Sequence, residues 1–269
     1  MGSDFALGVD IGGTKIAVGA VDARGRLDRL THLATANTSL DELAHAVAHT
    51  GDGLGAHGVG VGICEVVDAE GRIRSHTSID WTEEELAGAL GSIVLDADVR
   101  AGALAEARLG AGRDFESFVY VTVGTGISHA LVVDGEPHRG AHGCAQLIGS
   151  APLTLTCPHC GERISLSAED VASGAAVARG TPLVEAAEML GSFIALLVNV
   201  LDPAAVVVGG GLGTAGGDYW TALERSVRAH VWAEHVRNVP VLQAGLGADS
   251  GVIGAGLVAL HAAETEEVR

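Results

Sequence analysis

Hydrophobic residues near the start of the chain form a pattern of strand, turn and strand. Residues 5–22 (FALGVDIGGTKIAVGAVD) are two apolar runs on either side of a Gly-Gly-Thr sequence. Residues 118–134 (FVYVTVGTGISHALVVD) repeat this pattern around Gly-Thr-Gly, and Gly12 falls on Gly124 at an offset of 112 positions. We infer an internal duplication of a β-hairpin.

Helices and further strands are expected between and after the two hairpins. Two S/T-x-x-E capping boxes, at residues 39–42 and 82–85, begin helices that run to about residues 50 and 90. Short strands are expected at 57–64, 92–95, 204–208 and 239–244, helices at about 99–109, 183–201, 219–235 and 251–263, and a loop-rich stretch at 136–166. Alternating strands and helices predict an α/β protein. We expect the last helix to pack against the first half of the chain.

The composition indicates a globular protein with an acidic surface. The chain has 269 residues, a formal net charge of -18, 48% hydrophobic residues and 39 glycines, a surplus that base composition alone would also explain. An acidic surface repels a polyphosphate backbone, so no nucleic-acid partner is expected. No apolar run approaches the roughly 18 residues that span a bilayer, and no signal-peptide pattern is present. We therefore expect a cytoplasmic enzyme without a membrane partner.

The turn of the first hairpin has the chemistry of a phosphate-binding loop. Gly12 and Gly13 let backbone N–H groups approach phosphate oxygens, and Thr14 adds a hydroxyl donor. Lys15, the only lysine of the chain, adds a cation, and Asp10 offers a hard oxygen ligand for Mg²⁺. An ordinary glycine turn is the alternative.

The second turn consists of Gly124, Thr125 and Gly126. It would face the first turn if the two halves are related by a pseudo-twofold axis, and the pair would clamp the two ends of a polyphosphate. The later glycines Gly210 and Gly211 follow a buried strand and would let a nucleotide base or ribose lie against the backbone.

Asp98 directly precedes a predicted helix. This position is typical of an N-cap residue. A carboxylate between two glycine-rich hairpins is also suited to accept a proton from a substrate hydroxyl during phosphoryl transfer. The sequence leaves both roles open.

Cys157 and Cys160 form a C-x-x-C knuckle, which is half of a zinc site. His142 and Cys144 would complete the ligand set, and a loop without metal is the alternative.

These features, in this order, resemble the ROK family of sugar kinases and repressors, within the actin, Hsp70 and sugar-kinase superfamily. Residues 9–15 (VDIGGTK) look like the family's first phosphate motif and residues 120–127 (YVTVGTGI) like its second. Residues 96–106 (DADVRAGALAE) resemble its catalytic N-D-A-N-A-A-A-L-A-E, and residues 209–213 its adenosine loop. The resemblance covers nearly the whole chain.

The resemblance implies a two-domain actin-like ATPase (ribonuclease H-like) fold with an interdomain cleft, divided into residues 1–112 and 113–269. It also implies ATP and Mg²⁺ as cofactors, a homodimer, and Asp98 as the base that activates a hydroxymethyl group for the γ-phosphate of ATP.

The chain departs from the family where the family binds its sugar. Ala97 replaces the Asn before the catalytic Asp. The family's G-E-I-G-H appears as residues 146–150 (QLIGS), so Leu147 replaces a sugar-binding Glu, and Ser150 a His that touches sugar and zinc.

Two further departures lie nearby. A cysteine ligand of the family's zinc site falls on Ser165 and another sugar-binding Glu on Ser167, while Glu65 adds a carboxylate in the family's Pro-Gly turn. The candidate substrate-binding residues are therefore Glu65, Ser78, Ala97, Asp98, Gln146, Leu147, Ser150 and Ser167.

These departures predict an unusual acceptor. Loss of several charge-assisted hydrogen bonds, each worth about 1.5–3 kcal/mol, predicts weak binding of glucose. We expect a C7-cyclitol of the valienol or valiolone type, phosphorylated on its exocyclic hydroxymethyl group in secondary metabolism. A kinase of an amino sugar such as kanosamine, or of an ordinary hexose, is the nearest alternative.

Two other classes of protein are less favoured. A ROK repressor would need a DNA-binding domain before Asp10, which lies too near the N-terminus to leave room for one. A non-catalytic sugar sensor would not need Asp98 and Asp10, which are both retained.

Overall fold

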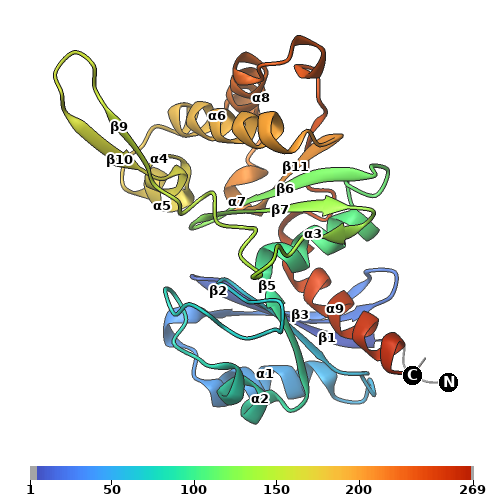
Figure 1. Ribbon diagram of the computed structural model, residues 1–269. Helices are drawn as coiled ribbons and strands as arrows, with labels where there is room; N and C mark the ends of the chain where they lie inside the picture. The colour runs from blue at the N-terminus through green and yellow to red at the C-terminus, as the bar shows by residue number, and fades with distance from the viewer. Residues whose placement is uncertain (1–4, 268–269) are drawn as a thin grey trace.

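Two five-stranded sheets form the two lobes of the molecule. The computed structural model describes residues 5–267 (Figure 1). In the first sheet, β1 pairs antiparallel with β2 across a tight turn and parallel with β4 through a helical crossover. The strand order is β3-β2-β1-β4-β5, at Leu27–Ala34, Lys15–Asp22, Phe5–Ile11, Val59–Ile63 and Ile93–Ala97.

The second sheet repeats the first. Its strand order is β12-β11-β6-β7-β8, at Val241–Gln243, Ala205–Gly209, Ser117–Val123, Ile127–Val133 and Glu136–Pro137. As β1 does with β2 and β4, β6 pairs antiparallel with β7 and parallel with β11. A shift of 112 positions carries the bounds of β1 onto those of β6. The predicted duplication is confirmed, and it extends to all five strands of each sheet.

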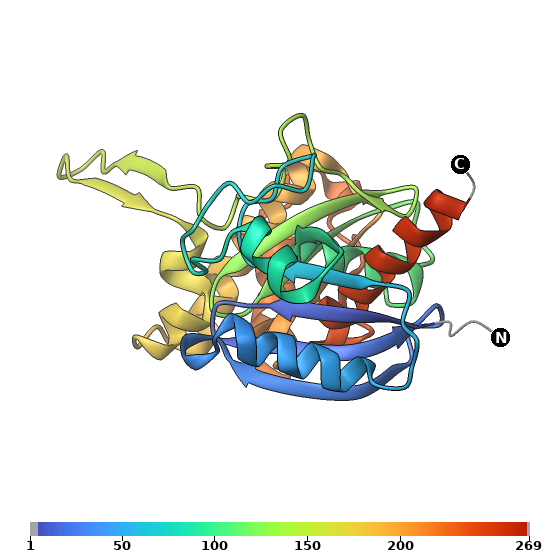
Figure 2. The ribbon, with the colours of Figure 1, turned by 90° about the horizontal axis from the view of Figure 1, so that it is seen from below.

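Helices cover the outer face of each sheet and fill the space between the sheets. Helices α1 and α2 pack on the first sheet, and Figure 2 shows α1 in front of its strands. Helices α6 and α8 share a core with β6 and β11 of the second sheet, while α3 and α9 pack together between the sheets. The helices are α1 Leu40–Gly51, α2 Glu83–Leu90, α3 Asp98–Arg108, α4 Ala168–Ala172, α5 Gly174–Ala178, α6 Leu183–Leu201, α7 Gly210–Gly213, α8 Gly217–His230 and α9 Ser250–Glu267.

The two capping boxes form as the sequence predicts. The Ser39 side chain accepts the backbone N–H of Glu42, and the Glu42 carboxylate accepts the backbone N–H of Ser39. Thr82 and Glu85 make the same reciprocal pair at the start of α2. Each box satisfies N–H groups that the first turn of a helix leaves free.

The last helix returns to the first lobe. The chain passes to the second lobe after α3, and α9 then packs on β1, β2 and β4. The packing expected for this helix is therefore confirmed, while the exact boundary at residue 112 stays a prediction. Strand β3 and the short helices α4 and α5 were not expected from the sequence.

The expectation that no apolar segment approaches the length of a membrane span is wrong for one helix. Helix α6 is long and apolar enough to cross a bilayer by length and composition. Its residues Leu190, Ile194 and Val198 are buried in the core of the second lobe. One face of this helix packs against α8 and the second sheet, whereas Leu196 and Val200 are exposed.

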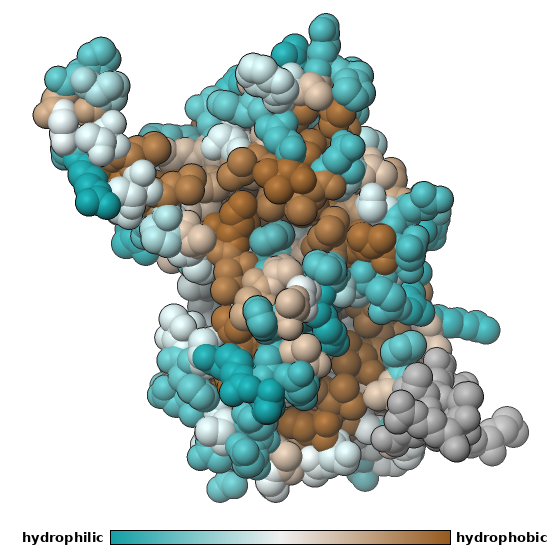
Figure 3. All heavy atoms as spheres, in the orientation of Figure 1, coloured by the Kyte–Doolittle hydropathy of each residue, from teal (hydrophilic) through white to brown (hydrophobic). Residues whose placement is uncertain are grey.

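Residues 136–166, which the sequence predicts to be loop-rich, contain a projecting hairpin. Its strands are β9, Leu153–Thr156, and β10, Arg163–Leu166. Leu153 lies opposite Leu166, and Leu155 opposite Ile164, so one face of the hairpin carries four exposed apolar side chains. In Figure 3 apolar side chains lie where this arm joins the body. The alternation of apolar and polar residues in both strands is the period of a β-strand, and the loop prediction missed it.

Candidate active site

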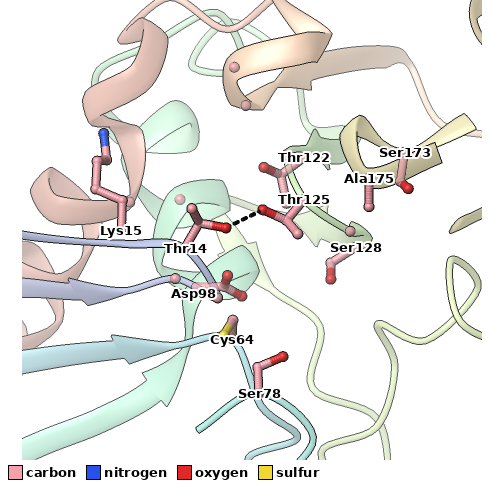
Figure 4. A pocket seen from close by; sticks show the side chains of 18 of the residues that line it. Thr14, Lys15, Cys64, Ser78, Asp98, Thr122, Thr125, Ser128, Ser173 and Ala175 are labelled. Carbon is pink, nitrogen blue, oxygen red and sulfur yellow. Dashed lines mark hydrogen bonds between the residues drawn. The ribbon is translucent and has the colours of Figure 1, made fainter. Parts of the chain in front are cut away.

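A cavity of about 650 Å³ lies where the turns of the two duplicated hairpins meet. The turns, called the phosphate turns below, contribute Gly12, Gly13, Thr14 and Lys15 from the first lobe and Gly124, Thr125 and Gly126 from the second. The Thr14 and Thr125 hydroxyl oxygens are 2.8 Å apart and hydrogen-bonded (Figure 4). The two turns face each other, as the pseudo-twofold relation predicts.

Glycine is required at different positions of the cavity for different structural reasons. Gly210 has a φ of +81°, and a Cβ there would lie 2.5 Å from the carbonyl oxygen of Val123. A Cβ on Gly124 or Gly211 would meet no atom within 4 Å. Because these two glycines line the cavity, a ligand can approach their backbone directly. Part of the glycine surplus is therefore structural.

Asp98 lies in the cavity at the junction of β5 and α3. The N-cap of α3 is Ala97, which is fully buried, and Asp98 is the first helical residue. One Asp98 carboxylate oxygen accepts the backbone N–H of Val99 at 2.6 Å. Burial, together with the negative charge of Asp10, raises the pKa of Asp98 to about 7. The N-cap interpretation of Asp98 is wrong, and a carboxylate with this pKa is suited to proton transfer.

Asp10, the penultimate residue of β1, is the residue best placed to hold a divalent cation. Burial raises the pKa of its carboxyl to about 6, and the positive charge of Lys15 opposes this shift. None of the hydrogen bonds found among residues 5–267 reaches its carboxylate, although the carboxylate lines the cavity. A buried carboxylate that faces a cavity and accepts no hydrogen bond from the protein is suited to bind a hard cation such as Mg²⁺.

The described residues place no third ligand beside the predicted zinc ligands Cys157 and Cys160. Cys157 and Cys160 lie at the tip of the β9–β10 hairpin, in the loop between the strands. Within residues 5–267 no group of three or more His, Cys, Asp and Glu side chains is arranged to hold a metal ion. The ligand set expected with His142 and Cys144 is therefore not assembled.

Two of the candidate substrate-binding residues besides Asp98 line the cavity, Ser78 and Ser167. Glu65 does not line it but fixes Ser78 in place. Its carboxylate accepts the backbone N–H groups of Ser78 at 2.5 Å and of Ile79 at 2.9 Å, and also the Ser75 hydroxyl. Burial would raise the pKa of Glu65, but these hydrogen bonds lower it overall. Glu65 is thus an internal support of the wall and not a free ligand.

Four candidates do not line the cavity: Ala97, Gln146, Leu147 and Ser150. Ala97 is fully buried, and Gln146 is buried with its side chain hydrogen-bonded to protein groups. Leu147 is 39% exposed, and the Ser150 hydroxyl donates to Glu169 at 3.0 Å. Their expected direct contact with a substrate is not supported, because these side chains are turned to protein or solvent.

Glu169 is the charged cavity residue that the sequence reasoning missed. It lines the cavity, and its carboxylate accepts the backbone N–H of Ile127 at 2.8 Å as well as the Ser150 hydroxyl. Ser167 instead caps α4 in a reciprocal pair with Asp170. The inference that this wall has lost its carboxylates is therefore wrong. The Ser-x-x-Asp pattern at 167–170 was the available signal, because it marks a helix start and places Glu169 in its first turn.

Other residues of the cavity were also not foreseen. They are Cys64, Gly102, Tyr120, Thr122, Ser128, Glu169, Asp170, Ser173, Ala175, Arg179, Gly247, Ala248, Ser250 and Gly251. Four of them precede or begin α9, the helix that returns from the second lobe. The cavity therefore draws on both ends of the chain. A cleft between two lobes with facing glycine turns and a carboxylate between them is the site of a phosphotransferase.

The chain belongs to the ROK family, whose family model matches residues 6–182 and 181–262. Glucokinase of Streptomyces coelicolor is 27% identical over 93% of this chain and 96% of its own length. Kanosamine kinase of Amycolatopsis mediterranei is 31% identical over 70% of this chain and 66% of its own length.

The fold agrees with solved structures of the family. A ROK family glucokinase from Streptomyces griseus, in complex with glucose and AMPPNP, has a TM-score of 0.83 at 27% identity and covers 94% of this chain and 98% of that chain. The resemblance to ROK proteins and the actin-like sugar-kinase fold are confirmed. Fold and relatives place the protein among the ATP-dependent sugar kinases of this family.

Proposed function

We propose that the protein transfers the γ-phosphoryl group of ATP to the exocyclic hydroxymethyl group of a sugar-like carbocycle, a C7-cyclitol of the valienol or valiolone type. The observation that carries the transfer step is the Asp98 carboxylate in the cavity between the phosphate turns. Phosphoryl transfer needs mainly a positioned acceptor, a base and groups that stabilise negative charge. The residues of this cavity offer all three.

Asp98 acts as the general base. It accepts the proton of the acceptor hydroxyl while that oxygen attacks the γ-phosphorus, and the bond from the γ-phosphorus to the β–γ bridging oxygen breaks to release ADP. The backbone N–H groups of the phosphate turns and the Lys15 ammonium stabilise the negative oxygens. Mg²⁺, when bound at Asp10, neutralises charge on the β- and γ-phosphates.

The pH dependence of the reaction should report the raised pKa of Asp98. The base must be unprotonated, so activity is lost as pH falls through the pKa of about 7 and is retained above it. We expect kcat/KM for the acceptor to fall about tenfold per pH unit below that value at saturating Mg-ATP. A profile that stays flat from pH 8 down to pH 5 would contradict the assignment of Asp98.

The part of the cavity around Asp98, called the acceptor side below, supports a carbocyclic substrate. Cys64, Ser78 and Ser128 lie on the Asp98 side of the cavity (Figure 4), and Ser167 and Glu169 from the start of α4 are included with them as lining residues. Burial raises the pKa of the Cys64 thiol to about 12, so this side chain is neutral. Ala97 has no polar group to offer, and the Ser150 hydroxyl already donates to Glu169. Besides Asp98, Glu169 is the charged side chain on this side, so fewer polar groups than the family motif supplies remain to recognise an anomeric hydroxyl.

An amino sugar such as kanosamine is the second candidate, because Glu169 and Asp170 place two carboxylates in the cavity wall. A carboxylate attracts a protonated amine more strongly than a hydroxyl. The 31% identity to a kanosamine kinase favours the same candidate.

An acceptor panel separates these candidates. ADP release would be measured with valienol-type and valiolone-type cyclitols, kanosamine, N-acetylmannosamine and glucose at fixed Mg-ATP. We expect kcat/KM for a cyclitol to exceed that for glucose by about 100-fold, the effect of two lost hydrogen bonds. A maximum with kanosamine would favour the second candidate. Equal turnover of glucose would overturn the carbocycle, and no turnover at all would favour a sugar sensor.

The homodimer, the cytoplasmic location and a role in secondary metabolism stay predictions from the resemblance and the composition.

A further inference from the structure

Arg100 is a buried arginine in the first turn of α3, two residues after Asp98. Its side chain is 1% exposed. Its Nε donates to the Asp96 carboxylate at 2.6 Å, and Asp96 is the penultimate residue of β5. A charge is buried this completely only where partners surround it, so each of its donors has a structural role.

The other donors of Arg100 reach two segments that are distant in the sequence. Nη2 donates to the carbonyl oxygen of Val67 at 2.8 Å, in the segment between β4 and α2. Nη1 donates to the carbonyl oxygen of Gly143 at 2.7 Å and to the Gln146 side-chain oxygen at 2.8 Å. One guanidinium therefore joins the base of α3 to a segment of each lobe.

Two further contacts complete the cluster. Arg139 donates to both oxygens of Asp96, at 2.6 Å and 3.3 Å, so two guanidinium groups share one buried carboxylate. The Gln146 side-chain nitrogen donates to the carbonyl oxygen of Glu65 at 3.5 Å. Every group in the cluster belongs to α3, to the C-terminal end of β5, or to one of two segments, residues 64–79 and 139–150.

One segment lines the acceptor side of the cavity, and the other supports a residue that lines it. The segment of residues 64–79 contains Cys64 and Ser78, and Glu65 holds the backbone at Ser78. The segment of residues 139–150 ends at Ser150, which donates to Glu169. Arg100 itself does not line the cavity, so its effect on a substrate is transmitted through these segments.

We propose that Arg100 is a positioning residue that fixes two segments relative to Asp98: residues 64–79, which line the acceptor side, and residues 139–150, which support Glu169 in its wall. The inference rests on the proposed function for the identity of the acceptor side. A planar guanidinium presents donors in several fixed directions, whereas a lysine ammonium presents three donors from one point. Lysine at this position keeps the charge but cannot reach both Val67 and Gln146 together with Asp96.

The test compares Arg100→Lys with Arg108→Lys, a matched change on the same helix. Arg108 is half-exposed and pairs with Glu136 at the surface, so its variant should match wild type. For Arg100→Lys we expect the acceptor KM to rise at least about tenfold, the scale of a small misplacement, with the KM for ATP unchanged. Gln146→Leu, which leaves the pair of Arg100 with Asp96 intact, should raise the acceptor KM in the same direction but less.

Hydrogen exchange gives a readout that does not depend on turnover. In Arg100→Lys we expect faster amide exchange in residues 64–79 and 139–150 and unchanged exchange in the phosphate turns. Unchanged exchange in both segments would overturn the proposal. So would an equal rise of both KM values, or a loss of fold in Arg100→Lys together with wild-type kinetics in Gln146→Leu. If wild type turns over no acceptor, the proposed function fails, and the exchange result alone still decides the role of Arg100.

Discussion

Asp98→Asn is expected to lower kcat by about 10³-fold, because removal of a general base typically costs 10²–10⁴ in rate. Asparagine has the same shape and keeps an oxygen to accept the N–H of Val99, so the start of α3 should be preserved. It cannot accept the proton of the acceptor hydroxyl. The measurement is ADP release at saturating ATP and acceptor, with the best acceptor of the panel.

The control for this variant is Asp114→Asn, the same change at an exposed aspartate that pairs with its neighbour Arg113. It should leave kcat at the wild-type value. ATP binding and the melting temperature of Asp98→Asn should also match wild type. A loss of less than about tenfold in kcat would show that Asp98 is not the base.

Gly60→Ala is expected to destabilise the protein by about 3 kcal/mol, the upper part of the range for overpacking. Gly60 is the second residue of β4, and a Cβ there would be 1.8 Å from the backbone carbonyl oxygen of Ala255 in α9. Gly8 in β1 makes a similar approach, 2.1 Å from the carbonyl oxygen of Val252. The helix backbone cannot yield locally as a flexible side chain would, so α9 must shift as a whole.

The measurement is the melting temperature, which should fall by about 6–12 °C for a domain of this size. The matched control is Gly88→Ala in α2, where a Cβ meets no atom within 4 Å and the residue is exposed. That change should leave stability unchanged or raise it by about 0.5–1 kcal/mol, since alanine is the better helix former. Equal melting temperatures for the two variants would contradict the close packing of α9 on β4.

The duplicated hairpins and the position of Asp98 could be predicted from the sequence because their signals are local. Two apolar runs around a glycine turn define a hairpin, and the repetition of this pattern made each turn more credible than one alone. The facing of Thr14 and Thr125 followed from symmetry. The start of α3 was placed one residue too late, because aspartate is a preferred N-cap residue, whereas here the N-cap is Ala97, which makes no side-chain cap hydrogen bond.

The walls of the acceptor side could not be predicted in the same way because they depend on contacts between distant segments. Gln146 was expected to meet substrate, but it meets Arg100, a residue 46 positions earlier. Motif matching placed the missing carboxylate at Ser167, whereas the first turn of α4 presents Glu169. A motif match assigns each role by position in the sequence, so it did not detect that the carboxylate lies two residues later, at Glu169.

The position of the phosphate on the product tests the central claim most directly. The product of the best acceptor would be analysed by ³¹P–¹H correlation spectroscopy. The account predicts phosphate on the oxygen of the exocyclic methylene group, formed about 10³-fold more slowly with Asp98→Asn than with wild type. Phosphate on a ring hydroxyl, or release of inorganic phosphate from ATP without a phosphorylated acceptor, would contradict it.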